Sequence, residues 1–177
     1  MAELSAHLDA MTEKQYAIRD ELKTVNRRLA TLDEHIKHSG NYKAYRPQKV
    51  QYEKLYAQYT AIQKAGGLFV ERKAQKALDT ANDYYETHRM EITLYEADDK
   101  YLREVMQGHF DPKKSPPVKK WIAERDSKTA DKKRFDIQYR ELWNGTATVE
   151  KIKRSIDDIL NEGTGERHRK RTQNMER

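Results

Sequence analysis

The chain of 177 residues contains no cysteine and only seven glycines and four prolines. Without cysteine, the chain can form neither a disulfide framework nor a zinc site built on thiolates. No apolar run approaches the roughly 20 residues that a membrane-spanning helix needs. Residues 1–15 also lack the apolar stretch of a secretory signal. We therefore expect no membrane insertion and a cytoplasmic location.

Apolar residues are scarce and charged residues are common, each class making up 36% of the chain. A compact globular domain is usually about half apolar, so a large spherical core is excluded. Disorder would also produce such polarity, but 11 tyrosines and regularly spaced apolar residues argue against it. The composition predicts a single elongated all-α domain, residues 1–162, with a narrow core.

The first segment has the clearest periodicity. Its apolar residues recur in alternating steps of four and three, with Gln15 as the one polar position: Leu4, Leu8, Met11, Ile18, Leu22, Val25, Leu29, Leu32 and Ile36. A period of 3.5 is the coiled-coil pattern and predicts a helix over residues 3–38. Gln15 either fixes the register or lies near a frayed end. Ser39-Gly40-Asn41 is expected to end the helix, with Gly40 as a left-handed cap.

Three shorter helices are predicted next, over residues 42–64, 68–87 and 90–107. Pro47 must lie near a helix start or a kink, because it removes a backbone donor. Ala65-Gly66-Gly67 is the strongest break in the chain. Nine of the 11 tyrosines fall between residues 42 and 101. Because a tyrosine hydroxyl needs a partner, these helices suit a small, partly wet cap over residues 42–107.

A last long helix is predicted over residues 116–161, with Ser115-Pro116-Pro117 at its start. Its apolar pattern keeps phase across Gly145, so this glycine is either a weak point in one helix or a break between two. We expect the helices 3–38 and 116–161 to pair as an antiparallel coiled-coil stalk. Residues 163–177 are polar and basic, which predicts a flexible, disordered tail.

The net charge of +6 lies entirely in the last part of the sequence. Residues 1–110 hold 17 basic and 17 acidic side chains, whereas residues 111–177 hold 18 basic and 12 acidic ones. Basic patches attract nucleic-acid backbones without reading sequence, although lysine-rich helix surfaces also serve solubility alone. The candidate DNA-binding residues are Lys113, Lys114, Lys119, Lys120, Arg125, Lys132, Lys133, Arg134, Arg167, Arg169, Lys170 and Arg171.

A second basic stretch is interleaved with aromatic residues between positions 42 and 52. Its members are Tyr42, Lys43, Tyr45, Arg46, Lys49 and Tyr52. Such mixtures can bind single-stranded nucleic acid by backbone attraction and base stacking. The alternative, which we favour, is that these tyrosines pack the cap.

Catalytic and metal-binding patterns are absent from the sequence. His35 and His38 share one helix face and could begin a metal site, but a third ligand is missing, so a solvated helix end is favoured. Asp98-Asp99 and Asp157-Asp158 are expected to be exposed helix charges. There is no glycine-rich phosphate loop and no serine nucleophile elbow. We therefore predict no enzyme activity, no catalytic residue, no metal and no cofactor.

Four segments together resemble the C-terminal helical region of relaxases, the mobilization nucleases of conjugative elements in Gram-positive bacteria. They are ELSAHLDAMTEKQYAIRDELKTVNRRLATLDEHI at 3–36, YETHRMEITLYEADDKYL at 85–102, WIAERDSKTADKKRFDIQYREL at 121–142 and VEKIKRSIDDIL at 149–160. Relaxases nick DNA with an N-terminal domain that uses a tyrosine and a His-hydrophobe-His cluster. No His-x-His occurs here, so no catalytic residue carries over. The resemblance implies a non-catalytic region that holds DNA, a relaxosome protein or the transfer machinery.

Two functions are therefore weighed. The first is an accessory helical module in conjugative DNA mobilization that contacts DNA non-specifically or binds relaxosome or transfer-machinery partners. The second is a protein-interaction or dimerisation rod without nucleic acid, in which the stripe of residues 4–36 reaches a second chain. The first is compatible with a monomer, and the second predicts a coiled-coil dimer.

Overall fold

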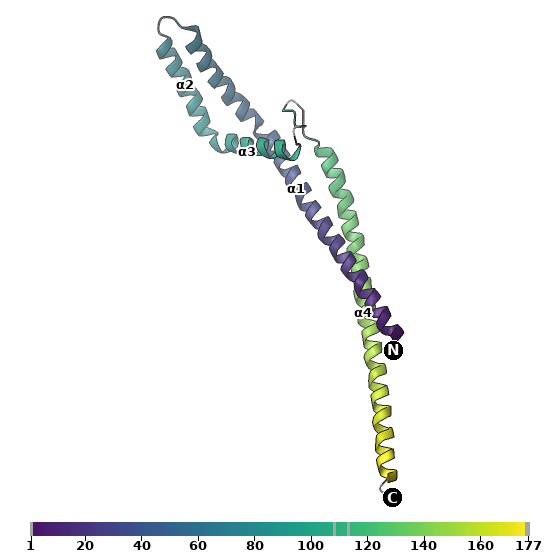
Figure 1. Ribbon diagram of the computed structural model, residues 1–177. Helices are drawn as coiled ribbons and strands as arrows, with labels where there is room; N and C mark the ends of the chain where they lie inside the picture. The colour runs from purple at the N-terminus through teal and green to yellow at the C-terminus, as the bar shows by residue number, and fades with distance from the viewer. Residues whose placement is uncertain (1, 108, 113, 176–177) are drawn as a thin grey trace. The chain divides into compact units, whose positions relative to one another are not determined.

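The computed structural model describes the backbone of residues 2–107, 109–112 and 114–175, and the side chains of this part of the chain as far as residue 162. These described residues form four helices and no strand (Figure 1): α1 (Ala2–Ala65), α2 (Val70–Thr87), α3 (Arg89–Val105) and α4 (Val118–Met175). The predicted all-α class, with long first and last helices, is confirmed. Within the described part of the chain, no helix has a stretch apolar and long enough to cross a bilayer.

The chain forms two compact units, each of which takes parts of the long helices. Unit 1 comprises Met1–Leu29 and Asp126–Arg177, and unit 2 comprises Ala30–Arg125. α1 and α4 therefore contribute residues to both units, whereas α2 and α3 belong to unit 2 alone.

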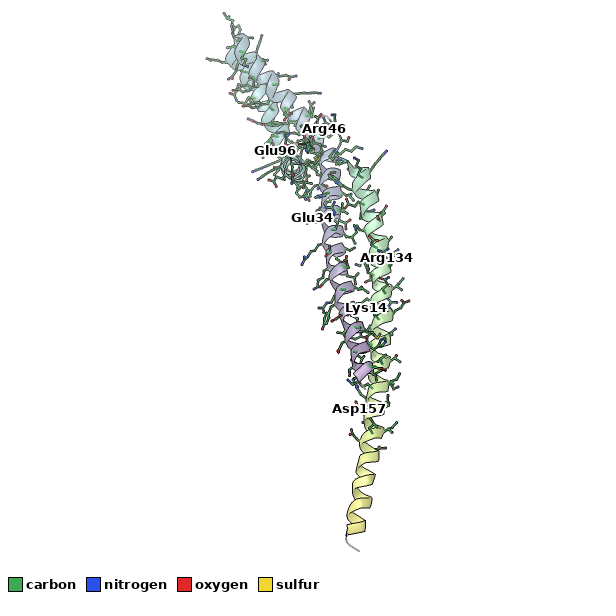
Figure 2. All side chains as sticks on the ribbon, turned by 45° about the vertical axis from the view of Figure 1, so that its right-hand side comes forward. Lys14, Glu34, Arg46, Glu96, Arg134 and Asp157 are labelled. Carbon is green, nitrogen blue, oxygen red and sulfur yellow. The ribbon has the colours of Figure 1, made fainter. Side chains whose placement is uncertain are left out.

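In unit 1, the first part of α1 packs on α4, and Figure 2 shows Lys14 and Arg134 on these neighbouring helices. Lys153 Nζ donates to Ser5 Oγ at 3.0 Å. Gln15 Nε2 donates to Thr146 Oγ1 at 2.7 Å and to the Leu142 carbonyl at 3.3 Å. Residue numbers thus rise along α1 as they fall along α4.

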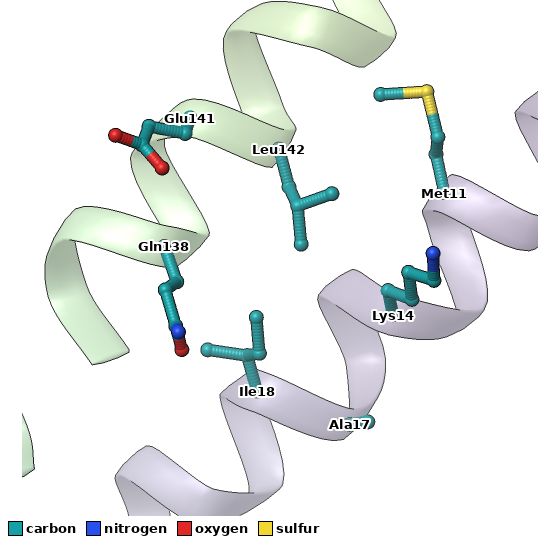
Figure 3. A pocket seen from close by; sticks show the side chains of 7 residues that line it. All are labelled: Met11, Lys14, Ala17, Ile18, Gln138, Glu141 and Leu142. Atoms are coloured by element: carbon teal, nitrogen blue, oxygen red, sulfur yellow. The ribbon is translucent and has the colours of Figure 1, made fainter. Parts of the chain in front are cut away.

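Gln15 is a buried and bonded position of unit 1, not part of a frayed end. Its amide is satisfied from α4, so its burial does not leave an unpaired donor. Beside it, Ile18 and Met11 of α1 face Leu142 of α4 along a groove of 490 Å³, which is completed by Lys14, Ala17, Gln138 and Glu141 (Figure 3). The apolar stripe of α1 is therefore in contact with this same chain.

Unit 2 has a core drawn from three helices. Leu32 of α1 and Ile92 and Leu102 of α3 are fully buried. Burying each of these side chains contributes about 1.5–3 kcal/mol. α2 adds Ala74 and Ala81, which are buried and seven residues apart. Their small size permits close approach of the α2 backbone to its neighbours.

Tyrosines in unit 2 form ring pairs between helices. Tyr42 of α1 stacks on Tyr95 of α3 with ring centroids 4.8 Å apart, and the Tyr95 hydroxyl donates to the Tyr42 hydroxyl at 3.2 Å. Tyr52 of α1 meets Tyr85 of α2 at 5.2 Å. Tyr42 and Tyr52 therefore both take part in packing between helices of unit 2.

The prediction that α1 ends at Ser39-Gly40-Asn41 is wrong, because the helix continues to Ala65. Ser39 and Tyr42 are both buried, and they lie three residues apart on the packed face of the helix. Gly40 is exposed between them, and an added Cβ would meet nothing within 4 Å. Burial of its neighbours outweighs the roughly 1 kcal/mol that glycine costs a helix.

Pro47 also lies inside α1, rather than at a helix start. It is exposed, so water can bond the carbonyl of Lys43, which loses its helical donor. Gly66 and Gly67, by contrast, end α1 with φ of 65° and 107°, as predicted. Phe69, the residue before α2, also has a positive φ of 66°, which is uncommon for a side chain of this size.

α4 begins at Val118, two residues after the predicted start, and crosses Gly145 without a break. The single-helix alternative is thus the one observed. Its backbone continues to Met175, whereas a disordered tail was predicted from residue 163. Residues 163–175 contain no proline, so every residue keeps a backbone N–H that can donate a helical hydrogen bond. The helix can therefore extend from the residues that precede this segment.

Candidate nucleic-acid interface

A groove of 630 Å³ lies in unit 2 between the middle of α1 and the segment that leads into α4. Its apolar lining comes from Ile36, Tyr42, Pro116, Pro117 and Val118. Gly40 also lines it and adds no side chain, so this side of the groove stays open. The α1 residues that line the groove lie on both sides of residues 39–41. The groove therefore depends on α1 being one continuous helix there.

Four cations surround the groove: Lys43 and Arg46 from α1 (Arg46 is labelled in Figure 2), and Lys119 and Lys120 from the first turn of α4. All four are exposed. Among the described residues, none of them forms an ion pair with a carboxylate. The first turn of α4 has no acidic residue, so the positive end of the helix dipole there is not neutralised locally. The rim therefore carries a net positive field.

The fold thus brings two of the predicted DNA-binding residues, Lys119 and Lys120, together with two further cations. Lys43 and Arg46 were not in the predicted DNA-binding set, although their interleaving with tyrosines had drawn attention to them. The detectable signal was their spacing of three, which places both on one helix face. Their proximity to residues 119 and 120 could not be read from the sequence.

Two other predicted basic residues of unit 2 lie near carboxylates. Lys114 Nζ lies 3.7 Å from Asp111 Oδ2. Arg125 lies 4.0 Å from Asp33. Lys113 lies outside the described residues. Both pairs are long and largely exposed, so they hold these cations only weakly.

Lys132, Lys133 and Arg134 belong to unit 1 and are not part of the groove. Arg134 donates to Asp131 at 3.1 Å, and its guanidinium lies 5.1 Å from the centre of the Phe135 ring. Lys133 is exposed, and Lys132 is half-buried. The side chains of Arg167, Arg169, Lys170 and Arg171 lie outside the described residues.

Unit 2 also contains a buried polar cluster that sequence reasoning missed. His38 Nδ1 lies 2.6 Å from Asp98 Oδ1, and His35 Nδ1 lies 2.8 Å from the Tyr101 hydroxyl. The Tyr101 ring stacks on His38 at 3.9 Å, and His35 meets the Trp121 ring at 5.0 Å. These contacts join α1 to α3 and to the start of α4.

The cluster corrects two predictions. Asp98 is 3% exposed, so it is not the exposed helix charge that was expected. His35 is 7% exposed, so it does not lie at a solvated helix end. The available signal was spacing, because Asp98 lies four residues before the buried Leu102 and shares its helix face. Among the described residues, no group of three or more His, Asp or Glu side chains could hold a metal ion. The cluster is a buried hydrogen-bonded contact between helices.

No protein-family model, curated protein or solved structure matches this chain. Nothing in these comparisons links the chain to relaxases, so the resemblance of the four segments stays a hypothesis. Function is therefore inferred from the groove and the charges around it.

Proposed function

We propose that this chain is a non-catalytic helical module that holds DNA without sequence preference. The observation that carries the proposal is the set of four cations without carboxylate partners around the groove of unit 2. With the segments that resemble relaxase C-terminal regions, this charge suits an accessory role in conjugative DNA mobilization in the cytoplasm. Relaxosome and transfer-machinery proteins are the further partners that the resemblance implies.

We further propose that unit 1 is an antiparallel coiled-coil stalk. Support comes from the opposite order of its interhelical contacts and from the 3.5-residue period of α1. The rod without nucleic acid is less favoured, because it requires the stripe of residues 4–36 to reach a second chain. Part of that stripe already contacts Leu142 and Gly145 within this chain.

Salt dependence measures the number of phosphate contacts. Four cations that each neutralise one phosphate give a slope of log affinity against log salt of about −3.6 for duplex DNA and about −2.8 for a single strand. Between 50 and 200 mM salt, affinity for duplex DNA then falls about 150-fold. Duplex and single-stranded DNA are therefore expected to give different slopes.

The test is fluorescence anisotropy with labelled duplex and single-stranded DNA of one sequence, titrated across this salt range. The groove variant carries Lys43→Gln, Arg46→Gln, Lys119→Gln and Lys120→Gln. The control removes the same charge from other exposed positions of unit 2, and carries Lys54→Gln, Arg72→Gln, Lys73→Gln and Lys76→Gln.

The groove variant is expected to lose most of the affinity and most of the slope, while the control stays close to the unmodified chain. Equal losses in both variants would show that diffuse charge, not the groove, holds DNA. Absence of binding by the unmodified chain at 50 mM salt would reject the proposed DNA contact altogether.

A further inference from the structure

Four large apolar side chains of α4 are exposed on one face of unit 1. Ile152, Ile156, Ile159 and Leu160 are each between 37% and 68% exposed. Ile156 follows Ile152 by four residues, and Ile159 and Leu160 follow Ile156 by three and four, which places all of them on one side of the helix. Lys153 bonds Ser5 of α1, and Ile156 and Leu160 follow it by three and seven residues, so part of this apolar face continues the side of α4 that contacts α1. These two side chains are nevertheless 37% and 54% exposed.

Charges around the same face are divided by sign along the helix. Lys151 and Lys153 flank this face before residue 155, and Asp157 and Glu162 flank it after residue 156. Arg154 and Asp158 lie on the opposite side of the helix. Arg154 reaches Glu150 within its own helix at 3.5 Å, an exposed pair that contributes little. Figure 2 labels Asp157 on this stretch of α4. The segment therefore has a basic first half and an acidic second half around one apolar face.

We propose that residues 149–162 of α4 bind the same residues of a second copy of this chain, with the two helices antiparallel. In that arrangement, the basic half of each helix faces the acidic half of the other. The apolar residues meet near the twofold axis, at residues 155–156. A parallel arrangement would place each charge against its own copy, which is destabilising. Such a twofold contact is isologous and closes at two chains.

This pairing differs from a dimer through the stripe of residues 4–36, and it does not depend on the DNA contact. It uses a face that the described residues of this chain leave exposed. Because the segment is short, the interface is small and the association is expected to be weak and reversible.

Sedimentation velocity tests the pairing over protein concentrations from about 1 µM to about 1 mM, the range of weak association. The unmodified chain is expected to shift from monomer to dimer. Ile159→Ser should weaken the dimer at least tenfold. Ile137→Ser, which removes another exposed isoleucine of α4, should leave it unchanged. A chain that stays monomeric throughout, or equal effects of the two substitutions, would overturn the proposal.

Charge variants test whether opposite charges hold the two helices together. One variant carries Lys151→Glu and Lys153→Glu, and the other carries Asp157→Lys and Glu162→Lys. Each alone should lose the dimer, because the four charges that flank the apolar face then all have one sign. An equimolar mixture should recover it. Loss without recovery on mixing, with the helix content of both variants intact by circular dichroism, would reject charge pairing between the halves.

The absence of cysteine permits clean spin labelling at single introduced cysteines. Labels at Ser155→Cys should lie close together across the dimer axis. Labels at Thr148→Cys should be separated by about 22 Å along the helix axis if the helices are antiparallel. Short distances for both labels would indicate parallel helices and would refute the proposed geometry.

Discussion

Gly40 distinguishes a continuous first helix from a helix that ends at residue 39. In the structure Gly40 is helical and exposed, and a Cβ placed on it meets no atom within 4 Å. Gly40→Ala therefore adds a methyl group without a clash and replaces a poor helix former by the best one. We expect the free energy of unfolding to rise by about 1 kcal/mol.

A left-handed helix cap at this position would give the opposite sign. Alanine in the left-handed region costs roughly 1–2 kcal/mol, so Gly40→Ala would then destabilise the chain. The two backbones thus differ by at least about 2 kcal/mol in the effect of one methyl group. In a chain of this size, a gain of 1 kcal/mol raises the melting temperature by about 2–4 °C.

The assay is unfolding by urea and by heat, followed by circular dichroism. Gly66→Ala is the matched control, because Gly66 has φ of 65° and an equally open surrounding. It should lower the free energy of unfolding by about 1 kcal/mol or more. A lower stability of Gly40→Ala would refute both the continuous helix and the groove that depends on it.

Three further substitutions, one of them with a matched control, test contacts inside the units by the same assay. At Gly145 a Cβ would lie 2.7 Å from the terminal methyl group of Met11. Gly145→Ala should therefore raise the free energy of unfolding by less than about 0.5 kcal/mol, because moving that methyl group offsets the higher helix propensity of alanine. Asp98→Ala should lower the free energy of unfolding by about 1–3 kcal/mol, because Asp98 is buried and hydrogen-bonded. Its control, Asp99→Ala, removes a surface ion pair and should lower the same free energy by less than about 1 kcal/mol. Burial raises the pKa of Tyr95 above its ordinary value of 10.0. The folded chain then keeps a proton that the unfolded chain loses, so stability is complete below pH 10 and falls as the pH rises beyond it. Tyr95→Phe should reduce that fall.

Helices whose signals are local were predicted well. The break at Ala65-Gly66-Gly67 requires positive φ, which glycine supplies at low cost. One helix was predicted to end at residue 87 and the next to start at residue 90, and the joint between α2 and α3 lies at His88. Both features depend on residues that are adjacent in the chain, so no knowledge of distant packing is needed to find them.

Features that depend on distant packing were missed. Ser39-Gly40-Asn41 has the composition of a helix end, and only the burial of Ser39 and Tyr42 keeps it helical. Asp98 has the composition of an exposed charge, and its burial requires His38 from another helix. The groove likewise joins positions 43 and 46 to 119 and 120. Local preference is a weak guide wherever tertiary contacts decide the outcome.

The chain has two tryptophans, and each unit contains one of them. Trp121 of unit 2 lies against His35, while Trp143 of unit 1 is exposed beside Tyr139. Replacing either indole by phenylalanine would leave a chain whose remaining emission reports on a single unit. Fluorescence could then follow the melting of each unit separately, without any attached dye, and show whether the shared helices α1 and α4 make the two units unfold together.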